Sequence, residues 1–311
     1  MDTTDIARFE ANRDRLGALA YRLLGSAADA EDVVQDAFLR WEHADRARVD
    51  VPEAWLTKVV TNLAVDRLRS ARVRHERAVG AWLPEPLLGG DPMLGPAETV
   101  EQRESVTLAV LLLMERLTPT ERAVYVLREA FGHRHREIAE ILDITESASQ
   151  QHALRARRHL ASDRRGSRVD DAAARRIVEE FVDAAVSGRT DRLLEMLTDD
   201  VSAVSDGAGL ARRLLQYAAP ERVATMVRAG FAPTPAKRRI AGGVPAIHVG
   251  SVNGSPAAIA TVGDRVVGVV VLCLRGERVA TVFGVGALAR LGRLDAGWRL
   301  DEHDAPFIPA W

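Results

Sequence analysis

The stretch that decides the fold covers residues 117–160 and reads LTPTERAVYVLREAFGHRHREIAEILDITESASQQHALRARRHL. It opens with Thr-Pro-Thr-Glu at 118–121, a typical helix start in which Thr caps, Pro takes the first position and Glu reaches back. Two short helical patterns follow, at 135–142 and 146–161. Only the three residues Asp-Ile-Thr separate them. This arrangement predicts a helix-turn-helix.

The second helix of this pair carries side chains suited to DNA. Its exposed face is expected to hold Gln150, Gln151, Leu154, Arg155, Arg157 and Arg158. Arg and Gln can pair with guanine and adenine edges, and Arg also neutralises phosphate. Residues 146–168 contain six Arg against one Glu and one Asp. We interpret the segment as DNA-binding, with an ordinary solvated helix hairpin as the competing interpretation.

Apolar residues in the first 75 residues recur with a helical period, which predicts an all-α domain. The first helix is expected to end at Gly25 and the second to begin at Ser26. The acidic start of the second helix, DAEDVVQD (29–36), either complements the helix dipole or forms a docking surface for a partner protein. A third helix is expected to begin near Pro52.

Polar residues recur along this third helix at spacings of four or three, so they share one side. They are Lys58, Asn62, Asp66, Arg69 and Arg72. A face that mixes Asn with basic residues can contact unstacked bases and grip a backbone. The competing interpretation is a solvated charged face.

The stretch 76–100 contains four prolines and four glycines, which predicts a linker. Flexible linkers are usually small and polar, but here residues 81–88 read AWLPEPLL. A stiff apolar segment can lodge in a groove. We expect Trp82, Leu83 and Leu87 to anchor it on the C-terminal domain or on the helical domains, rather than only to cover a local apolar spot.

The pattern changes after a polar, basic stretch at 162–171. One or two helices are expected within 173–198, and short apolar runs separated by Gly-containing turns follow. These runs predict an antiparallel sheet, so the C-terminal domain is expected to be α+β. They lie at 244–250, 257–263, 265–276 and 278–286.

Composition narrows the functional classes. The chain has 311 residues, a net charge of −2, one cysteine and eight scattered histidines. We find no membrane-spanning run, secretory signal, phosphate loop or metal-ligand set, and we expect a cytoplasmic protein without metal or cofactor. Asp206, His248 and Glu302 are conceivable pocket residues, but no pair is arranged for acid–base catalysis, so no enzyme is expected.

Three segments resemble, in order and spacing, an extracytoplasmic function sigma factor. They are DAEDVVQDAFLRW (29–41), AWLTKVVTNLAVDRLRS (54–70) and the stretch 117–160. The rest resembles the subgroup with a fused SnoaL-like C-terminal domain, whose WLPEP linker motif is matched by Trp82-Leu83-Pro84-Glu85-Pro86.

The resemblance implies a multidomain protein with two all-α sigma domains and a C-terminal α+β SnoaL-like cone. Residues 1–75 would form sigma region 2, and residues 76–100 the linker. Residues 101–165 would form region 4 with its helix-turn-helix, and residues 172–311 the SnoaL-like regulatory domain. The implied partners are promoter DNA and core RNA polymerase, through its β′ clamp helices and β flap; an anti-sigma factor is a further candidate.

The resemblance also gives roles to the predicted faces. The residues that would dock on polymerase are Asp29, Glu31, Asp32, Gln35, Asp36 and Phe38. Asn62 and its basic neighbours, with the loop 43–50, would melt and read the −10 element. Gln150, Gln151, Leu154 and Arg155 would read the −35 element.

Two signatures of the C-terminal domain are matched in part. The family motif DGGGK stands here as Asp206-Gly207-Ala208-Gly209-Leu210, and NPDKL as Ala287-Leu288-Ala289-Arg290-Leu291. The resemblance implies that they contact the sigma core. The expected function is promoter-directed transcription initiation, modulated in cis by the C-terminal domain. The alternative is a stand-alone helix-turn-helix regulator with a ligand-sensing domain.

Overall fold

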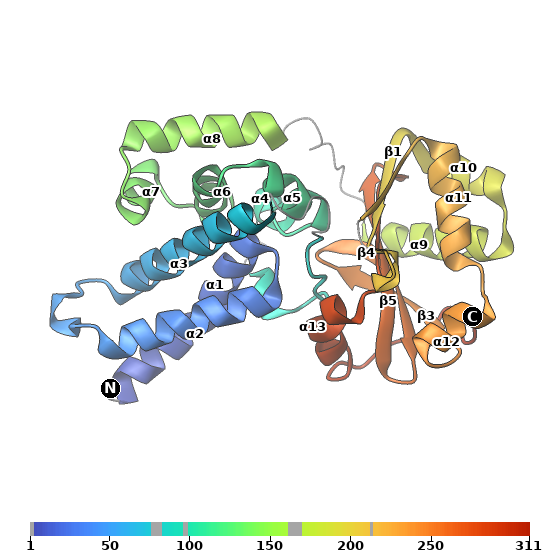
Figure 1. The fold of residues 1–311 in the computed structure, drawn as a ribbon, viewed down its shortest axis with the longest axis horizontal. Helices are drawn as coiled ribbons and strands as arrows, with labels where there is room; N and C mark the ends of the chain where they lie inside the picture. The colour runs from blue at the N-terminus through green and yellow to red at the C-terminus, as the bar shows by residue number, and fades with distance from the viewer. Residues whose placement is uncertain (1–2, 76–82, 96–98, 161–169, 212–213) are drawn as a thin grey trace. The chain divides into compact units, whose positions relative to one another are not determined.

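The computed structural model describes residues 3–75, 83–95, 99–160, 170–211 and 214–311. The chain folds as two compact units, drawn in Figure 1. The helical unit combines Met1–Val79 with Gly90–Arg164, and the C-terminal unit combines Gly80–Gly89 with Arg165–Trp311. The linker is therefore divided between the two units.

The helical unit is all-α, as its apolar periodicity predicts. Short 3-10 turns occur at Arg46–Arg48, Pro92–Leu94 and Met114–Arg116, and a π-helical turn at Val126–Ala130 continues α6. The helices are α1 Thr3–Leu24, α2 Ala27–His43, α3 Pro52–His75, α4 Val100–Glu104, α5 Leu108–Leu113, α6 Pro119–Tyr125, α7 His135–Leu142 and α8 Glu146–Leu160.

Side-chain caps set several helix starts in this unit. Thr118 and Glu121 form the predicted capping box: Thr118 Oγ1 accepts from the Glu121 backbone N–H at 3.2 Å, and Glu121 Oε2 accepts from the Thr118 N–H at 3.0 Å. Thr145 Oγ1 caps α8 by accepting from the Ala148 N–H at 3.1 Å. Asp143 takes the left-handed conformation in the helix-turn-helix turn, with φ 55°.

A buried arginine joins the two sequence segments of the helical unit. Arg22 of α1 is fully buried, and its Nε donates to Ser105 Oγ at 3.0 Å. Its guanidinium lies 5.5 Å from the centre of the Phe131 ring. Burial lowers the pKa of Arg22 to about 10. The second half of the linker packs here too, because a Cβ at Gly95 would lie 2.6 Å from that of Ala18.

The C-terminal unit is α+β, as predicted. A short 3-10 turn covers Gly207–Gly209. Its elements are α9 Asp171–Ser187, α10 Thr190–Met196, β1 Leu197–Ser205, β2 Leu215–Ala218, α11 Pro220–Phe231, α12 Pro235–Ala241, β3 Ala246–Val252, β4 Ser255–Val262, β5 Arg265–Arg275, β6 Arg278–Val285 and α13 Leu288–Trp298.

The described strands form one six-stranded sheet in the order β2-β1-β6-β5-β4-β3. The four apolar runs form the predicted antiparallel strands β3 to β6, and Asn253 and Gly254 turn β3 into β4 with φ 51° and 69°. One expectation is corrected, because the helical pattern of 173–198 ends at Met196, where β1 follows. The parallel pairing of β1 with β6 had no counterpart among the sequence predictions.

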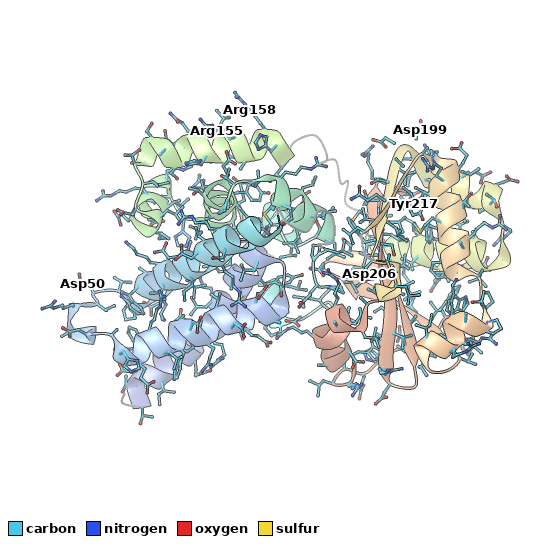
Figure 2. All side chains as sticks on the ribbon, viewed as in Figure 1. Asp50, Arg155, Arg158, Asp199, Asp206 and Tyr217 are labelled. Carbon is cyan, nitrogen blue, oxygen red and sulfur yellow. The ribbon has the colours of Figure 1, made fainter. Side chains whose placement is uncertain are left out.

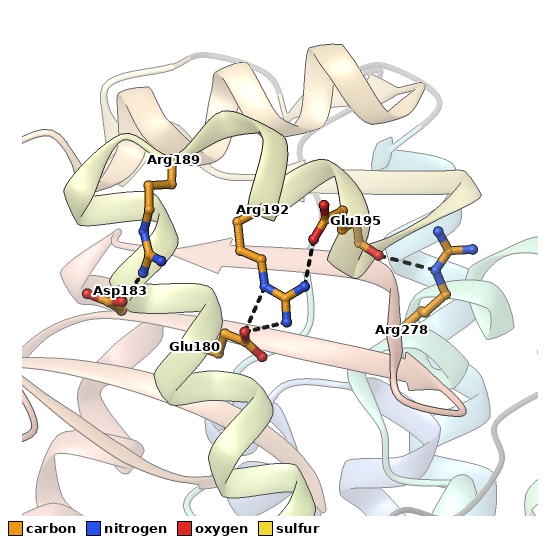
Figure 3. A network of polar contacts seen from close by, with 6 residues as sticks. All are labelled: Glu180, Asp183, Arg189, Arg192, Glu195 and Arg278. Carbon is orange, nitrogen blue, oxygen red and sulfur yellow. Dashed lines mark hydrogen bonds and ion pairs between the residues drawn. The ribbon is translucent and has the colours of Figure 1, made fainter.

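Helices α9 and α11 cover one face of this sheet, and α13 lies on the other side (Figure 1). The core between sheet and helices holds Phe181, Val227 and Leu272, all buried. An exposed ion pair between Arg192 and Glu180 joins α10 to α9, and Arg192 also pairs with Glu195 within α10 (Figure 3). Because these charges are paired with one another, we assign the network a structural role in joining the two helices.

Candidate nucleic-acid interface and linker anchor

The outer face of α8 presents most of the predicted DNA-binding side chains to solvent. Gln150, Gln151, Arg155 and Arg158 are exposed, and Leu154 is 49% exposed. The opposite face of α8 is buried through Ala153, Ala156 and Leu160. Figure 2 shows Arg155 and Arg158 on the side of α8 that faces away from the neighbouring helices. The helix thus offers a polar, basic surface of the kind that enters a major groove.

Arg157 differs from its neighbours. Its guanidinium forms an ion pair with Glu129, with Nη2 at 2.7 Å and Nε at 3.1 Å from Oε1. The Glu129 side chain is only 11% exposed. Arg157 therefore binds α8 to the π-helical turn Val126–Ala130. The helical spacing of the exposed residues does not predict this contact.

A histidine links the two helices of the helix-turn-helix. His135 Nδ1 lies 3.0 Å from the hydroxyl of Ser149, which is fully buried. Burial, followed by the charges of Arg128 and Arg157, lowers the pKa of His135. The imidazole is therefore held neutral near pH 7, where it can share this hydrogen bond.

The polar face of α3 is open along much of its length. Asp66 and Arg69 are exposed and paired at 3.2 Å, and Asn62 is half-buried. The Lys58 Nζ donates to the backbone carbonyl of Glu140 in α7 at 2.8 Å. One end of this face thus contacts the first helix of the helix-turn-helix. Side-chain placement for Arg72 lies outside the described residues.

The acidic start of α2 is partly neutralised. Arg67 of α3 lies 2.5 Å from Asp29 Oδ1 and 2.8 Å from Asp32 Oδ2. Burial alone would lower the pKa of Arg67, but its bonds to Asp32 and Asp29 raise it. Phe38 is half-buried and meets Phe9 edge-on at 5.0 Å. The exposed polar side chains of this surface are Glu31, Asp32, Gln35 and Asp36.

Residues 83–89, here called the anchor segment, are seated in the C-terminal unit. Leu83 and Leu87 are fully buried, and Pro84 and Pro86 are buried as well. The Leu87 N–H donates to Asn253 Oδ1 at 2.8 Å, and the Leu87 carbonyl accepts from the Asn253 N–H at 2.9 Å. Trp82, which we also expected to anchor the linker, lies outside the described residues.

The anchor segment also extends the sheet edge. Leu88 forms an antiparallel bridge with Val252 of β3, and the Gly89 N–H donates to the Ser251 carbonyl at 2.9 Å. At the other end, Arg290 of α13 donates to the Leu83 carbonyl. Backbone pairing and buried leucines therefore hold the anchor segment on the C-terminal unit.

The DGGGK-like turn is bound within its own unit. Asp206 accepts hydrogen bonds from the backbone N–H groups of Gly286 and Ala287, both at 3.0 Å. It thereby ties the end of β1 to the start of α13, whose Leu291 is buried. Gly207 and Gly209 have positive φ, and so does Ala208 between them at 56°. A Cβ at Gly286 would lie 3.0 Å from Ala208, so this junction is closely packed.

A cavity of about 920 Å³ opens in the C-terminal unit between the sheet and helices α11 and α12. Sequence patterns did not predict it. Among the described residues, no carboxylate or imidazole lines it. His248 and Glu302 line a separate hollow of about 450 Å³, where His248 packs edge-on against Trp298. The three conceivable pocket residues are therefore not brought together.

Within the described ranges, no group of three or more His, Cys, Asp or Glu side chains is arranged to hold a metal ion. None of the described helices is both long and apolar enough to cross a membrane.

Comparisons with known proteins agree with this geometry. Residues 8–74 match the family model for sigma-70 region 2, and residues 107–160 match that for sigma-70 region 4. The chain is 39% identical to the ECF RNA polymerase sigma factor SigJ of Mycobacterium tuberculosis over 208 residues, which are 67% of this chain and 66% of that relative.

A second relative covers more of the chain. The probable ECF RNA polymerase sigma factor SigI of Mycobacterium tuberculosis is 32% identical over 282 residues, covering 89% of this chain and 91% of the relative. The crystal structure of Mycobacterium tuberculosis SigJ aligns with a TM-score of 0.70 at 28% identity, covering 93% of this chain and 98% of that one.

The solved-structure match extends over both units. Together with the two family models, it confirms the expected fold of helical sigma domains followed by an α+β domain. The chain therefore belongs to the extracytoplasmic function family of RNA polymerase sigma factors, the proteins that direct polymerase to promoters.

Proposed function

We propose that the two faces of the helical unit divide the work of promoter recognition, and that the C-terminal unit modulates this activity in cis through the anchor segment. The observation that carries the proposal is the seating of the anchor segment. Linker residues 83–89 belong to the C-terminal unit, whereas the linker from Gly90 onward belongs to the helical unit. Any change in the C-terminal unit that releases the anchor segment lengthens the free part of the linker between the two units.

The exposed face of α8 is the proposed −35 reader. Gln150, Gln151 and Arg155 can present paired donors and acceptors to base edges, and Leu154 can contact a thymine methyl group. Arg158 extends the surface toward a phosphate. Arg157 has a different role, because its ion pair with Glu129 positions the helix.

The polar face of α3 is the proposed −10 reader. Asn62 and Arg69 offer hydrogen bonds to bases and charge to the backbone, and the loop 43–50 lies at the adjacent end of α2. Figure 2 labels the exposed Asp50 at the end of this loop. Because Lys58 is hydrogen-bonded to α7, polymerase must separate α3 from α7 before the whole face can meet DNA.

The α2 surface is the proposed contact with the β′ clamp helices of core polymerase. Its exposed members are Glu31, Asp32, Gln35 and Asp36. Arg67 pairs with Asp32 and with the neighbouring Asp29. The β flap is the proposed partner of the region 4 domain, and an anti-sigma factor is a further proposed partner. We place the protein in the cytoplasm, where its polymerase and promoter DNA are found.

The chain is proposed to act without catalysis of its own, since polymerase performs the chemistry. The described cavity residues include no carboxylate or imidazole, which supports this assignment. The Asp206 carboxylate accepts from the backbone N–H groups of Ala208, Gly286 and Ala287, which assigns it a structural role.

Transcription by core RNA polymerase with full-length variants tests the proposal. Arg155→Ala should reduce initiation at wild-type promoters by at least about tenfold, the loss of one good base contact. Arg175→Ala, on the exposed side of α9, is the matched control and should leave initiation unchanged. Leu87→Ala should change initiation at least about threefold through release of the anchor segment. Equal activity of wild type and Leu87→Ala would contradict control through this segment.

A further inference from the structure

The cavity of the C-terminal unit has an unusual rim. Four large apolar side chains that are exposed to solvent border its mouth: Leu210 at 73%, Ile240 at 52%, Leu288 at 51% and Leu215 at 39%. Grouped exposed apolar side chains mark a surface that is covered in the functional state. The hollow behind them, about 920 Å³, lies within the range of small-molecule sites.

The polar groups of the cavity define the chemistry it accepts. Lys237 is the charged residue among the described lining, and its Nζ already donates to the carbonyls of Gly230 at 2.8 Å and Ala232 at 2.9 Å, and to that of Ala229. It therefore caps the end of α11 and has no donor left for an anion. The Tyr217 hydroxyl, in contrast, forms no hydrogen bond with any described residue and is available to a ligand.

The rim and the anchor segment share one piece of chain. Gly286 to Ala289 line the cavity, and the next residue, Arg290, donates to the Leu83 carbonyl. Asp206 fixes this piece by accepting from the Gly286 and Ala287 N–H groups, and the Gly207–Gly209 turn beside it also lines the cavity. A ligand against this rim would thus contact the chain that holds the linker.

We propose that the cavity binds an uncharged, mainly apolar small molecule, whose polar group meets Tyr217, and that this binding strengthens the seating of the anchor segment. A ligand stabilises the conformation that it binds best. The conformation that the ligand would stabilise is the one described above, in which Arg290 donates to the Leu83 carbonyl. The regulatory meaning rests on the proposed function, but the tests below use no polymerase, so they fail or succeed independently of it.

Binding is tested on the full-length protein with the uncharged dye Nile red. Ala260 faces the cavity opposite Ile247, whereas Ala246 belongs to the neighbouring strand and is not part of the lining. Ala260→Trp should raise the Kd for the dye about tenfold or more by filling the cavity, and Ala246→Trp should change it less than about twofold. Decanol should displace the dye at a concentration about ten times lower than decanoate, because a buried carboxylate would lack a cation.

The link to the anchor segment is tested by amide hydrogen exchange of residues 83–89. Saturating decanol should slow exchange about tenfold in the wild type. Arg290→Ala removes the bond to Leu83 but lies outside the cavity lining, so it should keep dye binding and lose the effect of decanol on exchange. A purely structural role of Arg290 would change basal exchange only.

The two experiments distinguish three outcomes. We expect saturable dye binding that Ala260→Trp weakens, and we expect decanol to slow exchange at residues 83–89 in the wild type but not in Arg290→Ala. No saturable binding, or binding that Ala260→Trp leaves intact, would overturn the ligand site and mark the rim as a contact for protein. Binding without any change in exchange at 83–89 would overturn the link to the linker.

Discussion

Leu87 offers the sharpest perturbation of the anchor segment. Its side chain is fully buried in the C-terminal unit, and its backbone is bonded in both directions to Asn253. Shortening a fully buried Leu to Ala costs about 2–5 kcal/mol. Leu87→Ala keeps both backbone hydrogen bonds, so only the side-chain contribution is lost. We take about 3 kcal/mol, which shifts the equilibrium between seated and released segment roughly 150-fold toward release.

Amide hydrogen exchange measures this shift directly. The Gly89 N–H is bonded to the Ser251 carbonyl at 2.9 Å and becomes exchangeable when the segment is released. Its exchange should accelerate by about two orders of magnitude in Leu87→Ala. Leu300→Ala is the matched control, because Leu300 is 87% exposed in the same unit. Unchanged exchange in strand β6 would show that the unit itself stays folded.

One result would refute the reasoning. If the Gly89 amide of Leu87→Ala exchanges at the wild-type rate while β6 remains protected, the buried leucine does not hold the segment. Control in cis would then have to act through another contact.

Four further predictions concern the two units separately. Thr118→Ala should lower the free energy of unfolding by about 1 kcal/mol, measured with urea. Burial alone would raise the pKa of Glu121, but hydrogen bonds from Thr118 hold this pKa below 4.5. The contribution of Glu121 to the free energy of unfolding is therefore complete above pH 4.5 and is lost as the pH falls through the lower folded-state pKa. Glu121→Gln should remove this acid dependence of stability. Ala208→Gly should raise the melting temperature, since φ 56° costs an alanine about 1 kcal/mol, and a fall would show that the turn is unstrained. Arg155→Ala should change promoter preference at one position, whereas Arg157→Ala should lower stability and leave the preference intact, as a promoter library read by sequencing would show.

Local signals made the helical unit predictable. The capping box at Thr118 and the short turn before α8 lie within a few residues of the structure they specify. The outer face of α8 followed from helical spacing alone. Spacing could not show that Glu129 approaches Arg157, because the two residues are 28 positions apart. Nor could it show that Lys58 meets α7.

The C-terminal unit was predictable in part. Alternating apolar runs gave strands β3 to β6, but the parallel pairing of β1 with β6 joins residues far apart in sequence and has no local signal. The apolar residues of the WLPEP stretch indicate an anchored linker, but they do not identify the surface on which it docks. Asn253 lies in one of the Gly-containing turns, but the sequence does not reveal that its side chain accepts a hydrogen bond from the Leu87 N–H. The cavity likewise arises from the packing of distant elements.

The most direct test of the central claim is transcription from a DNA library by bacterial core RNA polymerase, with and without the full-length protein. The account predicts initiation at a defined set of start sites that appears only when the protein is present. Sequence-specific DNA binding by the protein alone, with no initiation at any site when core polymerase is added, would contradict it.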